Sequence, residues 1–537
     1  MRVTEFLVDT IRHAGVEVVF GVPGLHSLPM VAALERSGLR FIGFRQEQAA
    51  AHAADGYGRA TGRPGVVFLS AGPGTMNALT ALAEATASSS PVLAISATLS
   101  TRDLGRGRGA LHELSDPAPA YAAVTRFCDR ATRIDEIPTL ALKAIAATTA
   151  GRPGPSLIEV PADYFDAEVD GDAATLPPLP LEADRDAVNE AAFLLGLAAR
   201  PLIWAGGGVH RAFASAELTR VAELLGAPVI TTFMGKGAIP ESHGLALGTL
   251  VGWPEAAGVL RGADLLLAVG TRFTAMSTGG WRLELPEQTI HIDIDPAEIG
   301  RNYPVRLGIA AHARPALAAL ADSLEVRGQG GTPRRRWIDP SAVREGIVKR
   351  AREAGEKEMA RLDAVRRGLP TEVPIVHDMT VPSAWAWSFL PAGVPGTVHS
   401  PYGFGTLGFA LPAALGVAAS GGGPVVAFCG DAGLVAHVRE LATAVEHGLP
   451  VIVLVFNDRA RGALKTLSSA RYGTTFALDL AGPDFLALAG AFGVPARRAA
   501  EPGELERALA ESVAAGGPQL VEVPGEWAPL PLEDPYR

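Results

Sequence analysis

Two acidic residues in the last third of the chain have the positions expected of a metal site. Asp431 follows an apolar run at residues 425–429, and Asp458 follows a second apolar run at residues 451–456. Such runs, bounded by Gly or Pro, predict buried parallel strands, and residues 434–448 between them predict one crossover helix. Ligands of open α/β sheets bind at the carboxyl ends of the strands. Two hard oxygen ligands at that edge, beside a helix N-terminus, predict a Mg²⁺ ion that carries a phosphorylated ligand.

The remaining ligands of this predicted site follow from the neighbouring backbone. The carbonyl of Ala460, two residues after Asp458, can turn back to the ion, while phosphate oxygens and water complete the octahedron that Mg²⁺ prefers. Taken alone, Asp431 could equally be a solvated acid at a strand end, and its spacing from Asp458 is what favours the metal site. Further candidates for contact with the phosphorylated ligand are Gly430, Ala432 and Gly433.

Residues 403–408 read Gly-Phe-Gly-Thr-Leu-Gly and match the G-x-G-x-x-G pattern. One interpretation is a dinucleotide fingerprint with Asp431 on the ribose, which would make the chain a flavin or nicotinamide oxidoreductase. A lone match is weak, and Pro401 interrupts the apolar residues that would have to form the preceding strand. The favoured interpretation is that Gly405 and its neighbours let the backbone approach a flat ligand closely.

Two further motifs lie near the N-terminus. Glu47 opens a helix of small residues, where the helix dipole alone would favour an acid. A carboxylic acid in an alanine-lined interface can also keep its proton and share it with a ligand nitrogen. The second motif, residues 70–77, is a strand end that turns into a helix, and its alternative is a simple glycine-proline turn. Its candidate binding residues are Gly72, Pro73 and Asn77.

The elements that position these motifs alternate between strand and helix along the whole chain, which predicts an α/β fold. A chain of 537 residues is too long for one core. We expect three doubly wound parallel-sheet domains at residues 1–165, 187–325 and 370–537. The Asp- and Pro-rich segment 166–186 is expected to be a linker between the first two.

Composition excludes several classes of protein. The net charge of −10 is spread along the chain, so neither a nucleic-acid nor a membrane partner is expected. No apolar run approaches the roughly 20 residues of a membrane span, and the N-terminus lacks the apolar core of a signal peptide. Only Cys128 and Cys429 occur, which predicts neither a disulfide framework nor a cysteine metal site. A reducing, cytoplasmic location is therefore expected.

Together, the four motifs resemble those of the thiamine diphosphate enzymes of the acetolactate synthase and 2-oxo acid decarboxylase superfamily. The order along the chain is also similar: a pyrimidine-binding domain, a middle domain and a diphosphate-binding domain. The middle block contributes residues 234–240 and 291–300 to the resemblance, which covers nearly the whole chain. In that superfamily the active site lies between the first block of one subunit and the third block of another, so a homodimer or homotetramer is implied.

The resemblance implies a role for each motif. Glu47 would hydrogen-bond N1′ of the aminopyrimidine, the Gly405 carbonyl would accept from the 4′-amino group, and Leu407 would hold the cofactor in its bent shape. The residues implied to hold Mg²⁺ and the diphosphate are Asp431, Asp458 and the carbonyl of Ala460. The positions at which the chain departs from the superfamily's usual residues are Gln46 (usually His), Ala432 (usually Gly), Asp458 (usually Asn) and Arg461 (often aromatic).

The substrate is less well determined by the sequence. His26 and His112 resemble pocket residues of benzaldehyde-lyase-like and guanidino-oxoacid-decarboxylase-like members, where they can move protons or orient a carboxylate. A lone His is more often structural, which is the alternative for each. Gln46 and Leu464 are further candidates for substrate contact. Some acetolactate synthases also hold FAD in the middle domain, so FAD is left open here.

The implied reaction is decarboxylation of a 2-oxo acid with transfer of the acyl carbanion to a second carbonyl, as in acetolactate synthases. The acceptor would be an aldehyde or a second 2-oxo acid. Three alternatives remain: a simple decarboxylase of an aromatic or guanidino 2-oxo acid, a benzaldehyde-lyase-like C–C lyase, and a non-catalytic paralogue. The presence of Glu47 argues against the last, since a protein without catalysis has no need of that acid.

Overall fold

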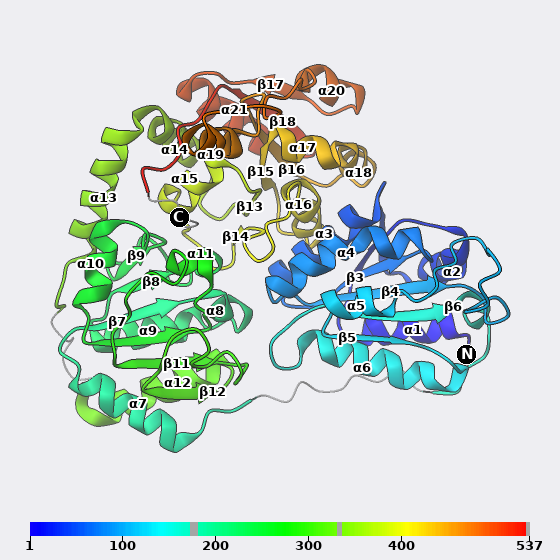
Figure 1. The fold of residues 1–537 in the computed structure, drawn as a ribbon, viewed down its shortest axis with the longest axis horizontal. Coiled ribbons are helices and arrows are strands. Elements are labelled where there is room, and N and C mark those ends of the chain that lie inside the picture. The colour runs from blue at the N-terminus through cyan, green and yellow to red at the C-terminus, as the bar shows by residue number, and fades with distance from the viewer. Residues whose placement is uncertain (172–180, 330–335, 533–537) are drawn as a thin grey trace.

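The computed structural model describes residues 1–171, 181–329 and 336–532, so residues 172–180 of the predicted linker lie outside the described residues. Three sheets of six strands each make up the fold (Figure 1). Every strand pair within the three sheets is parallel, and helices pack on both faces of each sheet. The predicted α/β class with three doubly wound parallel sheets is therefore confirmed. The exact domain boundaries stay predictions.

The first sheet has the strand order β2-β1-β3-β4-β6-β5. Neighbouring residues on a strand alternate between its two faces, so Val19 packs with α1, α2 and α6 while Phe20 packs with α3 and α4. Its strands are β1 (Val18–Gly21), β2 (Arg40–Gly43), β3 (Gly65–Leu69), β4 (Val92–Thr98), β5 (Phe127–Arg130) and β6 (Ser156–Pro161). Its helices are α1 (Val3–His13), α2 (Leu28–Ser37), α3 (Glu47–Thr61), α4 (Pro73–Ala87), α5 (Ala118–Val124) and α6 (Ile137–Thr149).

The second sheet has the strand order β12-β11-β10-β7-β8-β9. The chain adds strands on one side of β7 and then, from β10 on, on its other side. Its strands are β7 (Pro201–Ala205), β8 (Val229–Thr231), β9 (Ala246–Gly248), β10 (Leu265–Val269), β11 (Thr289–Asp293) and β12 (Leu307–Ala310). Its helices are α7 (Arg185–Leu197), α8 (Gly207–Arg211), α9 (Ser215–Leu225), α10 (Pro254–Gly262), α11 (Ala275–Thr278) and α12 (Ala313–Leu324). Two helices, α13 (Pro340–Ala354) and α14 (Glu356–Gly368), then lead to the third sheet.

The third sheet has the order β14-β13-β15-β16-β18-β17. Its strands are β13 (Ile375–His377), β14 (Val398–His399), β15 (Val425–Gly430), β16 (Val451–Asn457), β17 (Ala496–Arg498) and β18 (Gln519–Pro524). Its helices are α15 (Val381–Phe389), α16 (Ala410–Ala419), α17 (Asp431–His437), α18 (Leu441–Glu446), α19 (Gly462–Tyr472), α20 (Phe485–Ala491) and α21 (Pro502–Ala515).

The single crossover helix predicted at residues 434–448 is wrong. The structure divides this stretch into α17, a 3₁₀ turn at Val438–Glu440 and α18. At this break, the buried Glu440 carboxylate accepts hydrogen bonds from the backbone N–H of Arg45 at 3.3 Å and from the hydroxyl of Thr443 at 2.6 Å. The helix is therefore interrupted where Glu440 makes a hydrogen bond to the first sheet domain. Hydrophobic periodicity in the sequence does not reveal such a contact.

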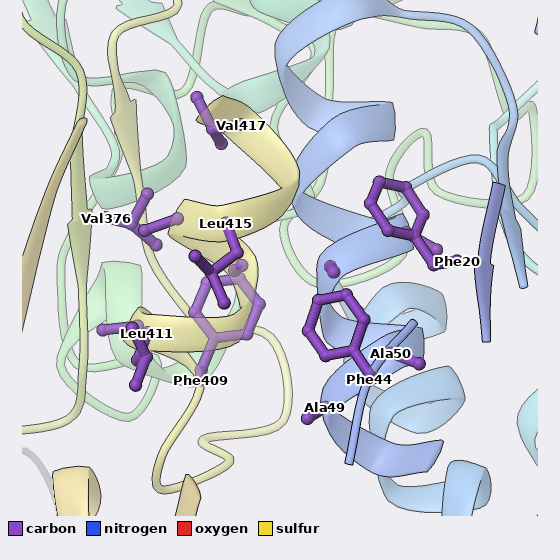
Figure 2. Close-up of a cluster of buried hydrophobic side chains, with 14 of the residues drawn as sticks. Phe20, Phe44, Ala49, Ala50, Val376, Phe409, Leu411, Leu415 and Val417 are labelled. Carbon is purple, nitrogen blue, oxygen red and sulfur yellow. The ribbon is translucent and has the colours of Figure 1, made fainter. Parts of the chain in front are cut away.

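The first and third sheets share one apolar core, because α3 and α16 lie side by side (Figure 2). Small residues permit this close approach. A Cβ built on Gly56 would lie 2.2 Å from the carbonyl oxygen of Ala413, and one on Gly416 would lie 1.9 Å from that of Ala53. The alanine-rich sequence of α3 is therefore required by the helix contact rather than by helix propensity.

Among the described residues, no helix combines the length and the apolar character needed to cross a membrane.

We predict that Gly416→Ala lowers the free energy of unfolding by about 1–3 kcal/mol, because the added methyl group overpacks the α3–α16 contact. Differential scanning calorimetry should show a lower Tm. The matched control is Gly346→Ala, in the exposed interior of α13, where a Cβ meets nothing within 4 Å. This change should raise stability by about 0.5–1 kcal/mol. Equal effects of the two substitutions would contradict the packing account.

Candidate active site

At the carboxyl edge of the third sheet, Asp431 and Asp458 end two hydrogen-bonded strands, as predicted. Asp431 directly follows β15 and is the first residue of α17, while Asp458 directly follows β16. The Asp431 Oδ1 accepts the N–H of Ala432 at 2.7 Å, and its buried Oδ2 has no partner. The Asp458 Oδ1 accepts the N–H of Ala460 at 3.0 Å. Each acid therefore keeps one carboxylate oxygen available for a ligand.

The two acids repel one another electrostatically. Burial raises the pKa of Asp431, and burial together with the charge of Asp431 raises the pKa of Asp458 to about 6. Two carboxylates that resist ionisation side by side are stabilised by a cation between them. Among the described residues there is no group of three or more His, Cys, Asp or Glu side chains that could hold a metal ion.

A cavity of about 100 Å³ opens over these acids. Leu407 and Leu464 line it and expose 44% and 50% of their surfaces, so both keep apolar surface available for a ligand. The Asp458 carboxylate lies over Gly462, at the start of α19, where a Cβ would come within 2.2 Å of it. The other predicted cofactor residues that line the cavity are Gly430, Asp431, Ala432, Gly433, Asp458 and Ala460.

Sequence reasoning missed three residues that line this cavity, namely Asp378, Thr380 and Trp527. Asp378 directly follows β13, so the rule that identified Asp431 and Asp458 could have found it too. Its buried carboxylate accepts the N–H of Gly408 at 2.9 Å and that of Met379 at 2.9 Å, while burial raises its pKa to about 6. The short length of β13 concealed this signal.

At the carboxyl edge of the first sheet, Glu47 and Asn77 come together, although they belong to separate motifs. Glu47 is the first residue of α3, and its Oε2 accepts from the Asn77 Nδ2 at 3.0 Å. A Cβ on Gly74 would lie 3.4 Å from the Glu47 Oε1, so glycine leaves room beside the acid. The other carboxylate oxygen of Glu47 is therefore accessible next to the start of α4, which begins at Pro73.

His26 and His112 also meet at this edge, with ring centroids 5.3 Å apart. His112 has a positive φ of 70°, and its carbonyl lies against Gly72, whose φ is also positive and which has no room for a Cβ. Partial burial, and then the neighbouring His112, lower the pKa of His26. Glu113 fixes the preceding loop by accepting the N–H groups of Gly107, Gly109 and Ala110.

The structure also describes the positions at which the sequence departs from the usual residues. Gln46 caps α3 by accepting the N–H of Ala49 at 3.0 Å, so its side-chain oxygen is engaged in the fold. Ala432 has no positive φ and therefore carries no backbone penalty there. Arg461 precedes α19 and lines the cavity beside Leu464.

Within one chain, the two groups of predicted residues do not line the same cavity. All described residues around the 100 Å³ cavity belong to the third sheet domain, and Glu47, His26 and His112 are not among them. A larger cavity of about 660 Å³ lies where the three domains meet. Burial, followed by the charge of a neighbouring arginine, lowers the pKa of Arg211 and of Arg272 in its lining to about 10.

Comparison with known proteins identifies the family. Three family models match the chain: the N-terminal TPP binding domain of thiamine pyrophosphate enzymes at residues 1–119, their central domain at 188–320 and their C-terminal TPP binding domain at 378–523. The chain belongs to the thiamine pyrophosphate enzyme family. The predicted resemblance is confirmed.

Three relatives match over nearly the whole chain. A "Probable acetolactate synthase large subunit" of Methanocaldococcus jannaschii is 34% identical over 99% of this chain and 93% of its own length. A "Probable 2-ketoarginine decarboxylase" of Pseudomonas aeruginosa is 34% identical over 96% of this chain and 93% of its own. The acetolactate synthase large subunit of Corynebacterium glutamicum is 32% identical over 94% of this chain and 83% of its own.

The residues of both edges fit the cofactor that gives this family its name. The unpartnered Asp431 Oδ2 and the accessible oxygen of Asp458 suit a cation that carries a diphosphate. The dinucleotide interpretation of residues 403–408 fits less well. This segment follows a two-residue strand, β14, and α16 begins only at Ala410, so no strand turns directly into a helix there.

We predict that His112→Gln raises the pKa of His26, because it removes the repulsive charge beside an imidazole that stays partly buried. NMR titration of selectively labelled histidine can measure this directly. His13→Gln, on α1, is the control and should leave the pKa of His26 unchanged. An unchanged or lower pKa in His112→Gln would show that the two rings do not interact as the structure places them.

Proposed function

We propose that the protein is a thiamine diphosphate- and Mg²⁺-dependent enzyme that decarboxylates a 2-oxo acid and transfers the acyl carbanion to a second carbonyl, like an acetolactate synthase. The observation that carries this proposal is the pair of half-sites: Glu47 beside Asn77 on one sheet edge, and Asp431 beside Asp458 on another. Full-length similarity to proteins named acetolactate synthase supports it.

Each half-site has a distinct task in this proposal. Asp431, Asp458 and the carbonyl of Ala460 would hold Mg²⁺ and, through it, the diphosphate, while Leu407 would contact the organic part of the cofactor from the cavity wall. Glu47 holds a proton at N1′ of the aminopyrimidine, and Asn77 orients the Glu47 carboxyl through its 3.0 Å hydrogen bond. The bound cofactor supplies an electron sink for the electrons left when CO₂ departs. The apolar walls at Leu407 and Leu464 exclude water from the reacting carbon.

We further propose that the site is completed by a second copy of the chain. Both half-sites have exposed apolar side chains around them, which a partner subunit would cover. Leu25 and Leu111, next to the two histidines in the sequence, expose 66% and 63% of their surfaces, and Phe404, in the same loop as Leu407, exposes 62%. Such apolar exposure is typical of an interface. A homodimer is the smallest assembly that unites Glu47 with Asp431, and a homotetramer is compatible with it.

A second candidate function is simple decarboxylation without carboligation. The paired imidazoles of His26 and His112 favour it, because a group that delivers a proton to the nascent carbanion releases an aldehyde instead of a ligation product. The similarity to a protein named 2-ketoarginine decarboxylase points the same way. A benzaldehyde-lyase-like enzyme would use the same residues to cleave a C–C bond, which is the reverse of the carboligation step.

The location of the protein and the presence of FAD stay predictions. The cytoplasmic location rests on the cysteine content alone. FAD remains open: the buried guanidinium groups of Arg211 and Arg272 in the larger cavity would suit its diphosphate, and the absorbance spectrum of the purified protein tests for it. A non-catalytic paralogue remains the alternative from another class, and turnover of any 2-oxo acid would exclude it.

The direct test of the proposed function is product analysis. We expect the purified protein, supplied with thiamine diphosphate and Mg²⁺, to release CO₂ from one member of a panel of pyruvate, benzoylformate and 2-oxo-5-guanidinovalerate. Mass spectrometry with and without an aldehyde distinguishes ligation products from free aldehyde. Aldehyde as the sole product favours the decarboxylase. No CO₂ from any member would contradict the proposal for these substrates.

We predict that Glu47→Gln leaves the Kd for thiamine diphosphate within roughly tenfold of the wild type. Turnover and exchange of the C2 proton of bound thiamine diphosphate should fall at least about a hundredfold, because an amide cannot hold the proton at N1′. Asp431→Ala is the contrasting variant and should abolish Mg²⁺-dependent cofactor binding. Proton exchange at the wild-type rate in Glu47→Gln, measured by NMR, would remove Glu47 from its assigned role.

A further inference from the structure

The loop at residues 403–408, which connects β14 to α16, rests on a carboxylate from the first sheet domain. The Glu84 Oε2 accepts the N–H groups of Phe404 at 3.2 Å, Gly405 at 3.0 Å and Thr406 at 3.3 Å, while its Oε1 accepts that of Gly403 at 3.3 Å. Four consecutive backbone donors therefore converge on one side chain. The loop also lies directly on the end of α4, because a Cβ on Gly403 would meet the backbone of Ala87 at 2.6 Å.

A buried carboxylate at Glu84 is energetically unfavourable unless residues 403–406 donate hydrogen bonds to it. Glu84 lies in the last turn of α4, where the helix dipole disfavours a negative charge, and its side chain is fully buried. The Ser88 hydroxyl donates to the Oε1 at 2.7 Å, and the guanidinium of Arg59 lies 3.7 Å away. These two groups and the four loop N–H groups are what compensate the buried carboxylate.

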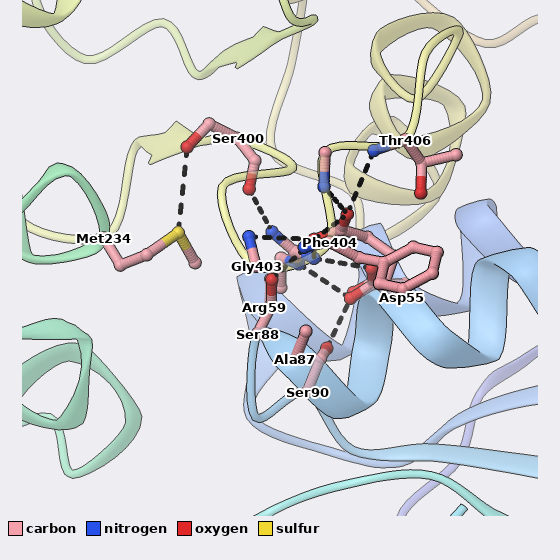
Figure 3. A network of polar contacts seen from close by, with 12 residues as sticks. Asp55, Arg59, Ala87, Ser88, Ser90, Met234, Ser400, Gly403, Phe404 and Thr406 are labelled. Carbon is pink, nitrogen blue, oxygen red and sulfur yellow. Dashed lines mark hydrogen bonds and ion pairs between the residues drawn. The ribbon is translucent and has the colours of Figure 1, made fainter. Parts of the chain in front are cut away.

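Arg59 extends this network to the start of the same segment. It forms a buried ion pair with Asp55 on α3 and donates to the carbonyl of Ser400 at 2.6 Å. Burial alone would lower the pKa of Arg59, but the negative charges of Asp55 and Glu84 raise it above its usual value. Figure 3 shows Asp55, Arg59 and Ser88 on one side of the domain boundary, with Ser400 on the other.

The far end of the loop is held by its own domain. Asp378 accepts the N–H of Gly408, and Gly408 has a positive φ of 82° with no room for a Cβ beside His437. In the sequence, Leu407 lies between residues 403–406, which bind the Glu84 carboxylate, and Gly408, which binds the Asp378 carboxylate. Leu407 itself is nearly half exposed and lines the cavity. Gly405 also has a positive φ, 81°, and its N–H is one of those that Glu84 accepts.

We propose that Glu84 is a positioning residue, which fixes the 403–408 loop from the first sheet domain so that Gly405 and Leu407 are preorganised for the aminopyrimidine and thiazolium part of the cofactor. This inference rests on the proposed function. It implies that recognition of the cofactor's organic part depends on the contact between the first and third sheet domains of the same chain. Recognition of the diphosphate by Asp431 and Asp458 does not depend on that contact.

The test is Glu84→Gln in the full-length protein. An amide has one acceptor oxygen, so some of the four N–H groups lose their partner in either orientation of the side chain. Hydrogen exchange measured by mass spectrometry should be at least about tenfold faster at residues 403–406 and unchanged in β15. The Kd for thiamine diphosphate with Mg²⁺ should weaken at least about tenfold, while the Kd for inorganic diphosphate with Mg²⁺ stays within about twofold.

Glu159→Gln is the matched control, because Glu159 is a buried acid of the first sheet domain that pairs with Arg130, away from the loop. It should change neither Kd. If Glu84→Gln does not fold, Ser88→Ala replaces it, with an expected increase in exchange at residues 403–406 of about threefold.

Two results overturn the inference about Glu84 alone: unchanged exchange and affinity in the variant, or equal weakening of thiamine diphosphate and inorganic diphosphate. If Ser88→Ala is the variant tested, unchanged exchange at residues 403–406 overturns it in the same way. A wild-type chain that does not bind thiamine diphosphate overturns the proposed function, and this inference with it. The two failures are therefore distinguishable by the behaviour of the wild-type protein.

Discussion

The close contact between α3 and α16 is the constraint on which the rest of the account depends. Backbone touches backbone at Gly56 and Gly416, so these helices fill the space between the first and third sheets and merge their cores. Among the described residues, the cavity over Asp431 is lined by the third sheet domain alone. Glu47 and Asn77 lie at a separate edge. In the proposed dimer, a second chain brings the two half-sites together.

Helix α4 connects both kinds of site within one chain. Its first turns present Asn77 to Glu47, and its last turn presents Glu84 to the 403–408 loop. The first sheet domain therefore has two tasks in the proposed dimer. It supplies the pyrimidine-facing acid to one active site and supports the cofactor loop of the other. Asp378, at the end of β13, supports the same loop from the third sheet.

Much of this arrangement could be predicted from the sequence, because it follows from strand ends. The apolar runs before Asp431 and Asp458 predicted two adjacent strands, and Glu47 was correctly placed at the start of a small-residue helix. The structure brings His26 and His112 together, while their place in a pocket and their roles stay predictions.

The contacts that periodicity does not encode were missed. Glu84 looks like an ordinary helical acid in the sequence, and only the three-dimensional contact between distant segments shows its four N–H partners. Asp378 followed a strand too short to stand out. The break in the helix after His437 serves a buried interdomain hydrogen bond of Glu440, so local propensity could not predict it. The oligomeric state likewise depends on surfaces rather than on local pattern.

Subunit complementation tests most directly whether the active site is built from two chains. Glu47→Gln and Asp431→Ala would each be inactive alone, and the two would be co-expressed with different affinity tags so that mixed assemblies form. In a mixed dimer one site carries both substitutions and the other carries neither. Random pairing should then restore about a quarter of the wild-type CO₂ release. No activity above that of the separate variants, in assemblies shown to contain both chains, would contradict the shared site.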